Sequence, residues 1–214
     1  MTQAGQPERP ERPERPERPG RSDWTRVRTP GLLLDLPVAD DAGDLFTLHA
    51  DPAVWTHFPG GVHTDPATGA AMVEQSVRQF AERGLGYWSV RVRAAGRGDT
   101  VVGRVGCCVP EDAPWWNLYY RLSPRVQGHG YAREAGQAAL VAAHDVDPDR
   151  PVMAFLLEHN TASRRTAEAI GLRLVWRGPD LGNPDPGAVR LVYLDRIPSA
   201  EIAAEIDRRF TPRS

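Results

Sequence analysis

The chain contains no lysine: all 26 of its basic residues are arginine, in a sequence of 214 residues. Without a primary amine, a P-loop lysine, a Schiff-base or pyridoxal lysine, the strand lysine of a protein kinase and an S-x-x-K nucleophile pair are all excluded. Binding of phosphate or stabilisation of developing charge must therefore be carried by arginine, backbone amides or neutral groups.

Cysteine is almost absent as well. Cys107 and Cys108 are adjacent in a segment with the pattern of a strand, where neighbouring side chains point to opposite faces. This spacing suits neither a disulfide between the two nor a zinc site, and we interpret them as small apolar strand residues. The six histidines show no H-E-x-x-H or comparable spacing, so no metal site is expected.

Long hydrophobic runs are missing too. The longest, residues 138–143 and 152–157, are far shorter than the roughly 18 to 20 residues that span a bilayer. No apolar stretch follows the N-terminal arginines, as a secretory signal would require. We expect a cytoplasmic protein that does not associate with membranes. The net charge of -2 lacks the basic excess typical of nucleic-acid binders, so no nucleic acid is expected as a partner.

Proline is concentrated at the N-terminus, where residues 7–19 repeat P-E-R four times and end in Pro19. Such a repeat has nothing to bury and favours a solvated extended chain; a P-x-x-P ligand for a recognition domain is the alternative reading. We divide the chain into a disordered leader (1–23), one folded domain (24–197) and a C-terminal helix with a tail (198–214).

Hydrophobic periodicity within the domain predicts a mixed α+β fold. Strands are expected at residues 32–36, 87–93, 100–109, 117–122, 152–157, 172–177 and 188–194. Helices are expected at 40–49, from 64 or 65 to about 83, at 131–144, 162–170 and 199–210. A loop rich in glycine, proline and large side chains, residues 51–61, separates the first two helices.

The most informative motif lies where a strand ends and an alanine-rich helix begins, and it reads Gln127-Gly128-His129-Gly130-Tyr131-Ala132. Glycines at the N-terminus of a helix let a phosphate approach the backbone amides at the positive end of the helix dipole. A Walker loop would need the missing lysine. A dinucleotide fingerprint starting at Gly128 would put Arg133 where its third small residue belongs. The spacing Q/R-x-x-G-x-G/A is satisfied throughout.

This motif resembles the pyrophosphate loop of the GNAT acetyltransferases, and further motifs agree with the branch that includes the ribosomal-protein alanine N-acetyltransferases. They are Asp51-Pro52, Gly103 with Gly106, Tyr120 to Pro124, Glu134-Ala135, Asn160-x-Ala162-Ser163 and Gly171 to Arg173. The resemblance covers about residues 28–195. It implies the GNAT fold: a mostly antiparallel twisted sheet, splayed between its fourth and fifth strands, with helices on both faces.

The resemblance further implies direct transfer of an acetyl group from acetyl-CoA, the only cofactor expected, to a primary amine. On that basis the backbones of Tyr120 and Leu122 would bind the pantetheine and acetyl groups. Asn160 would bind the pantetheine arm, and Ser163 would protonate the departing thiolate. The pyrophosphate would be held by Gln127, Gly128, His129, Gly130, Tyr131 and Ala132.

The acceptor side departs from the branch, which commonly reads E-L-G-Y where this chain has Asn117-Leu118-Tyr119-Tyr120. An alkylammonium must lose a proton before attack, and Asn117 cannot take it. Water or another group would do so, the candidates being Glu111, Asp112, Glu158 and His57. The residues expected along the acceptor site are His57, Phe58, Trp116 and Asn117.

The acceptor itself stays open: a peptide or protein N-terminus, or a small amine. An antibiotic-modifying acetyltransferase and a non-catalytic module that binds acyl-CoA are alternatives, the latter because Asn117 replaces an acid. A monomer or a homodimer is expected.

Overall fold

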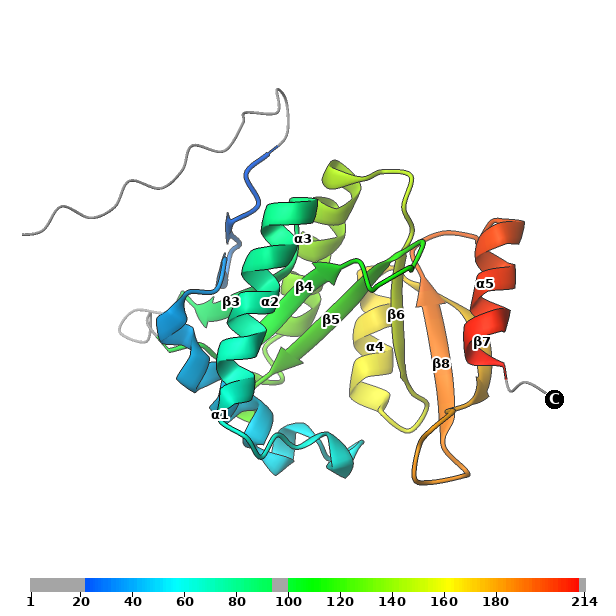
Figure 1. Cartoon of the computed structure of the whole chain (residues 1–214), viewed down its shortest axis with the longest axis horizontal. Helices are drawn as coiled ribbons and strands as arrows, with labels where there is room; N and C mark the ends of the chain where they lie inside the picture. The colour runs from blue at the N-terminus through cyan, green and yellow to red at the C-terminus, as the bar shows by residue number, and fades with distance from the viewer. Residues whose placement is uncertain (1–21, 94–99, 212–214) are drawn as a thin grey trace, which may run out of the picture.

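The computed structural model describes residues 22–93 and 100–211, in which eight strands form one sheet (Figure 1). The order across the sheet is β1-β2-β3-β4-β5-β6-β8-β7, and every neighbouring pair is antiparallel except β5 and β6. The strands are β1 (Arg26–Arg28), β2 (Leu32–Asp35), β3 (Tyr87–Val92), β4 (Gly103–Cys108), β5 (Trp116–Leu122), β6 (Val152–Leu157), β7 (Arg173–Pro179) and β8 (Val189–Leu194).

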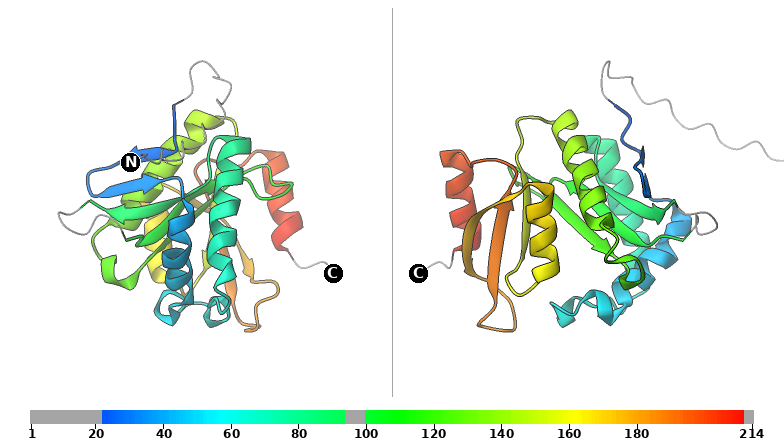
Figure 2. Two further views of the ribbon diagram at one scale, coloured as in Figure 1. Left: turned by 60° about the vertical axis from the view of Figure 1, so that its left-hand side comes forward. Right: turned by 180° about the vertical axis from the view of Figure 1, so that it is seen from behind.

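Helices cover both faces of this sheet (Figure 2). They are α1 (Ala42–Ala50), α2 (Ala67–Arg83), α3 (Tyr131–Val146), α4 (Thr161–Ile170) and α5 (Ala200–Phe210), with short 3-10 turns η2 (Pro52–Val54), η3 (Pro59–Gly61) and η4 (Pro124–Val126) among them. Helices α1 and α2 lie on one face and α3 and α4 on the other.

The main core lies beneath α3 and α4. Four alanines of α3, Ala135, Ala139, Ala142 and Ala143, are completely buried because they recur at helical spacing on the face turned to the sheet. Their small side chains let the helix approach large sheet residues such as Trp88 and Trp116. Every second residue along the strands belongs to this core, because successive side chains of a strand point to opposite faces of the sheet.

Helix α5 packs on the opposite face of the sheet's second half. Ile206 joins Trp115, Met153, Val192 and Leu194 in a separate buried cluster, with Phe210 packed against it. Ser199 caps the helix by accepting a hydrogen bond from the backbone N–H of Ile202. The C-terminal segment that the sequence sets apart from the domain therefore lies against the sheet.

In the described sheet the parallel pair, β5 and β6, diverges along its length. Strands β5 and β6 are in register only at Trp116↔Val152 and Asn117↔Met153, although both continue for several residues, whereas β4 and β5 are paired over six positions, from Gly103↔Leu122 to Cys108↔Asn117. The sheet therefore opens between β5 and β6 toward the carboxyl ends of both strands.

The expected fold class is confirmed. One element was missed: the three-residue strand β1 precedes the strand expected first, so the opening between the expected fourth and fifth strands is that between β5 and β6. Residues 94–99 of the expected hairpin and most of the leader lie outside the described residues. No helix in the described ranges is long and apolar enough to cross a bilayer.

Candidate active site

The backbone of β5 presents polar groups to the opening beside it. Trp116 donates its N–H toward β6, to the carbonyl of Pro151 at 2.8 Å, and Ser123 donates its N–H toward β4, to Val102 at 2.8 Å. Because these directions alternate along a strand, the backbone groups of Leu118, Tyr120 and Leu122 face the opening. An extended molecule can add there as a strand would.

At the carboxyl end of β5 the chain forms a compact glycine-rich loop. Ser123 is the N-cap of η4, and its side chain accepts a hydrogen bond from the backbone N–H of Arg125. Gln127 then turns back and donates from Nε2 to the carbonyl of Leu122 at 3.1 Å. Gln127, expected to bind the pyrophosphate, thus closes the loop onto β5. Its side chain occupies the carbonyl of Leu122, whose backbone is expected to bind pantetheine.

The two glycines of the loop take left-handed backbone conformations, with φ of 81° at Gly128 and 79° at Gly130. A Cβ added to either would meet nothing within 4 Å, so the loop surface is open at both. Gly130 is the N-cap of α3, and the first amides of an α-helix have no acceptor within it. The arrangement suits an anionic group such as a phosphate.

His129 and Tyr131 form the outer edge of this loop. Their rings stack with centroids 5.6 Å apart, and Nδ1 of His129 lies 2.9 Å from the carbonyl of Gln127. The Tyr131 ring also lies over Gly31, where an added Cβ would come within 2.8 Å of it, and Glu134 accepts a hydrogen bond from the Gly31 N–H. These contacts fix the first turn of α3 against the start of β2.

Across the opening, Asn160 and Ser163 begin α4. The Oδ1 of Asn160 caps the helix by accepting from the Ser163 N–H at 3.1 Å. The hydroxyl of Tyr120 donates to the Ser163 carbonyl at 2.9 Å and lies 3.0 Å from Ser163 Oγ. Burial raises the pKa of Tyr120 to about 12, so it keeps its proton near neutral pH. The predicted site residues Tyr120, Asn160 and Ser163 therefore meet.

The opposite face of β5, which α1 and α2 cover, carries Asn117, Tyr119 and Arg121. Asn117 donates from Nδ2 to the Tyr87 hydroxyl at 3.0 Å. The Tyr119 hydroxyl accepts from Nε of Arg121 at 2.6 Å and lies 3.0 Å from Nε2 of His49.

The other ring nitrogen of His49, Nδ1, lies 2.8 Å from the Leu45 carbonyl, which can only accept. Nδ1 therefore carries the proton and Nε2 accepts from Tyr119. Burial, opposed by the Leu45 hydrogen bond and aided by the charge of Arg121, lowers the pKa of His49 to about 3. This imidazole is neutral at physiological pH.

The segment between α1 and α2 forms the outer wall of this face. The guanidinium of Arg121 stacks over Trp55, 3.4 Å from the ring centroid, and donates to the Val54 carbonyl at 3.2 Å. The His57 carbonyl lies 2.8 Å from Nε2 of His159, just before Asn160. Burial and then Arg121 lower the pKa of His57 to about 4. The partly buried Phe58 follows, so the segment borders the opening.

Three of the sequence-predicted acceptor-side groups lie elsewhere. Trp116 is 1% exposed and belongs to the core beneath α3 and α4, because it alternates with Asn117 along β5. Glu111 and Asp112 are exposed in the loop that leads into β5, at the end where β5 and β6 still pair. They are therefore remote from the carboxyl-end opening.

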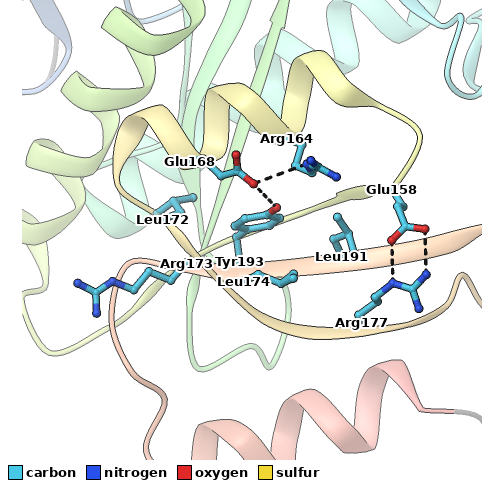
Figure 3. Close-up of a pocket in the computed structure, with 9 residues that line it drawn as sticks. All are labelled: Glu158, Arg164, Glu168, Leu172, Arg173, Leu174, Arg177, Leu191 and Tyr193. Carbon is cyan, nitrogen blue, oxygen red and sulfur yellow. Dashed lines mark hydrogen bonds and ion pairs between the residues drawn. The ribbon is translucent and has the colours of Figure 1, made fainter.

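Glu158 borders a different hollow, a cavity of about 300 Å³ between α4, β7 and β8 (Figure 3). It is paired there with Arg177, at 2.7 and 3.0 Å, and this hydrogen bonding lowers the pKa of the carboxyl group. In the same cavity Glu168 interacts with Arg164 and Tyr193. Glu158 is therefore committed to an ion pair and is not held as a poised base.

Sequence reasoning missed Tyr119, Arg121 and His49 as members of the site. Alternation along β5 from Asn117 would have indicated the first two. The place of His49 depends on how α1 lies across the sheet, which the pattern of α1 does not determine.

Residues 32–173, more than half of the chain, match the acetyltransferase (GNAT) domain family. The chain belongs to the GNAT family. It is therefore an acyl-CoA-dependent acetyltransferase, and acetyl-CoA is the acyl donor that GNAT acetyltransferases use.

Solved GNAT structures share its fold. An acetyltransferase from Agrobacterium tumefaciens is 23% identical, with a TM-score of 0.63 over 80% of this chain and 94% of its own. The ribosomal-protein-S5-alanine acetyltransferase from Vibrio fischeri is 14% identical, with a TM-score of 0.63 over 79% and 94%. The microcin C7 self-immunity acetyltransferase MccE, solved with acetyl-CoA and AMP, is 16% identical, with a TM-score of 0.59 over 79% and 94%.

The residues of this GNAT chain fit acetyl-CoA. The unpaired backbone edge of β5 suits the amide-containing pantetheine arm, and the open loop at Gly128 and Gly130 suits the pyrophosphate. The two features adjoin at Leu122, where the strand ends and the loop begins.

Proposed function

We propose that the chain is an N-acetyltransferase that moves an acetyl group from acetyl-CoA directly to a primary amine. The observation that carries the proposal is the opening between β5 and β6, bordered by the glycine-rich loop on one side and by the α1–α2 segment on the other. An acyl donor and an acceptor can thus reach the same point of the sheet from opposite faces.

The donor side is assigned to the loop and the two strand ends. Backbone groups of Tyr120 and Leu122 bind the pantetheine arm, with Nδ2 of Asn160, whose oxygen caps α4. Backbone amides of residues 127–132 bind the pyrophosphate at the N-terminus of α3. His129, exposed beside Tyr131, lies at the outer edge of this loop.

Acetyl-CoA supplies a thioester, and the transfer forms one bond and breaks another. The amine nitrogen bonds to the carbonyl carbon, the carbon–sulfur bond breaks, and the thiolate takes up a proton. Ser163 Oγ is the proposed donor of that proton, with the Tyr120 hydroxyl as its hydrogen-bond partner. The ammonium loses one proton to water before attack, because Asn117, Tyr119 and Arg121 include no carboxylate and the imidazoles of His49 and His57 are weak bases. The nitrogen loses a second proton as the amide forms, and this proton replaces the one that Ser163 Oγ gives to the thiolate.

A polycationic antibiotic is the less favoured acceptor. Recognition of several ammonium groups requires acidic side chains, whereas Asn117, Tyr119 and Arg121, which β5 presents on this face, include none. A peptide N-terminus or a small amine fits this face better.

The proposal is tested by thiol release from acetyl-CoA against a panel of amines and N-terminal peptides. Turnover with at least one amine is expected. If acetyl-CoA binds and no acceptor is acetylated, the chain is instead a non-catalytic acyl-CoA-binding module and the proposal is overturned.

A further inference from the structure

Two arginines face each other on the acceptor face without an acid between them. Arg104 of β4 and Arg121 of β5 are directly paired across the sheet, so their side chains emerge on the same face. Like charges in this position destabilise a sheet. Neither guanidinium forms an ion pair with any carboxylate of residues 22–93 and 100–211.

The polar partners of both arginines are neutral. Arg104 is 6% exposed; it donates to Gln75 Oε1 at 2.8 Å and lies over the Tyr87 ring. Its Nε is buried without a hydrogen-bond partner in the described part of the chain. Arg121 contacts Trp55, Tyr119 and Val54, as described above. A buried guanidinium in neutral surroundings is costly, because the lost hydration is not replaced by an opposite charge.

The surrounding groups add no negative charge. Burial, and then the charge of Arg121, lower the pKa of His63, as they do for His57. Asn117, on the same face of β5, is a neutral amide. The acceptor face thus holds two positive charges that this part of the protein does not neutralise.

From this juxtaposition we propose that the acceptor is an amine that also carries an oxyanion, a carboxylate or a phosphate, and that Arg121 binds the oxyanion. The inference rests on the proposed function and narrows its substrate class. Arg121 is the less buried member of the pair: it is partly buried, adjoins Tyr120 and Leu122 in the sequence, and lies beside Trp55. The planar guanidinium of Arg121 suits a bidentate contact with either oxyanion. The charge of Arg104, which is opposite Arg121 in the sheet, also attracts an anion.

The test uses pairs of acceptors in which one member carries the anion and the other does not, and each kcat/KM is referred to the unprotonated amine, because the anion also changes the amine pKa. Each pair shares one amine: an amino acid with its amide, and O-phosphoethanolamine with ethanolamine, with spermidine as a cationic acceptor. In the wild-type protein the anionic member of one pair should have a kcat/KM higher by roughly 10- to 100-fold, the worth of a hydrogen bond to a charged group. The pair that shows the difference identifies carboxylate or phosphate.

Variants assign the difference to Arg121. R121Q should reduce the ratio within the pair to near one, because the anionic acceptor loses more activity than the neutral one. R121K, which keeps the charge, should retain part of the ratio. Arg83 is exposed at the end of α2, away from this face, and R83Q should leave the ratio intact.

Three results would overturn the inference. The first is a wild-type ratio near one in both pairs, or a preference for spermidine, and this needs no variant. The second is an equal loss on all acceptors in R121Q, which would give Arg121 only a structural role in holding the α1–α2 segment. The third is acetyl-CoA binding without turnover on any amine, which removes the proposed function as well and is thereby distinguished from the first two.

Discussion

The hydroxyl of Tyr120 lies 3.0 Å from Oγ of Ser163, joining β5 to the first turn of α4 across the opening in the sheet. Because the same Tyr120 hydroxyl donates to the Ser163 carbonyl, the proton of Ser163 Oγ is free to point to Tyr120 or to a leaving group. This pair is the proton source that the proposed function assigns to the departing thiolate.

Replacement of Ser163 by alanine should therefore lower kcat by about 10- to 100-fold, since general-acid groups contribute on that order or more, while the affinity for acetyl-CoA changes little. Steady-state kinetics and calorimetric binding separate the two effects. Thr166 of the same helix donates its hydroxyl to the Ala162 carbonyl and is partly buried, as Ser163 is, so T166A is the matched control. Equal activity of S163A and T166A would remove Ser163 from the reaction.

The loop assignment predicts that G130D weakens acetyl-CoA binding by at least about tenfold, because a carboxylate would stand where a phosphate is expected. Gly182, between β7 and β8, has the same backbone conformation, with φ of 80° and nothing within 4 Å of an added Cβ. G182D should be destabilised about as much as G130D, by about 1 kcal/mol for a non-glycine residue in the left-handed conformation. It should keep its affinity for acetyl-CoA. Equal affinities of the two variants would contradict the loop assignment.

The pH dependence of turnover should follow the acceptor, not the enzyme. His49 and His57 have pKa values lowered to about 3 and about 4, so both stay neutral through the physiological range and neither is a strong base. The value of kcat/KM should rise roughly tenfold per pH unit up to the pKa of the amine. Two acceptors with different amine pKa values should show displaced profiles. If kcat/KM instead rose at the same pH for both acceptors, a group of the enzyme would be acting as the base.

Stability should also depend on His49. Its pKa is lower in the folded protein than in the unfolded chain, so the unfolded state binds more protons below about pH 6.5 and stability falls as the pH drops. Each pH unit in that range costs up to about 1.4 kcal/mol. Urea unfolding of the H49Q variant should therefore show a shallower acid loss than the wild type. If the wild type and H49Q lost the same stability as the pH falls, the acid sensitivity would come from other groups.

The sequence was sufficient for most of the elements and for the local conformation of the glycine-rich loop. Regular periodicity and strong end signals, such as Gly171 after α4 and Ser199 before α5, located most helices. The loop from Gln127 to Ala132 could be predicted because its glycine spacing is local: the backbone conformations that it requires are fixed within six residues.

The acceptor side could not be predicted in the same way. Its members come from α1, the α1–α2 segment, β4 and β5, and their meeting depends on sheet register and on how α1 packs. Trp116 illustrates the error: the sequence places it beside Asn117, but alternation along β5 sends one side chain to the core and the other to the acceptor face. Strand β1 was missed because three residues give too short a pattern.

The central claim, acetyl transfer to nitrogen at the opening between β5 and β6, is tested most directly by analysing the products of one reaction. The protein is incubated with acetyl-CoA and its best acceptor, and the free CoA thiol and the N-acetyl product are quantified together. The account predicts equal amounts of the two, near-complete loss in G130D at low acetyl-CoA and retention in G182D. Thiol release without an N-acetylated product, or full activity of G130D, would contradict it.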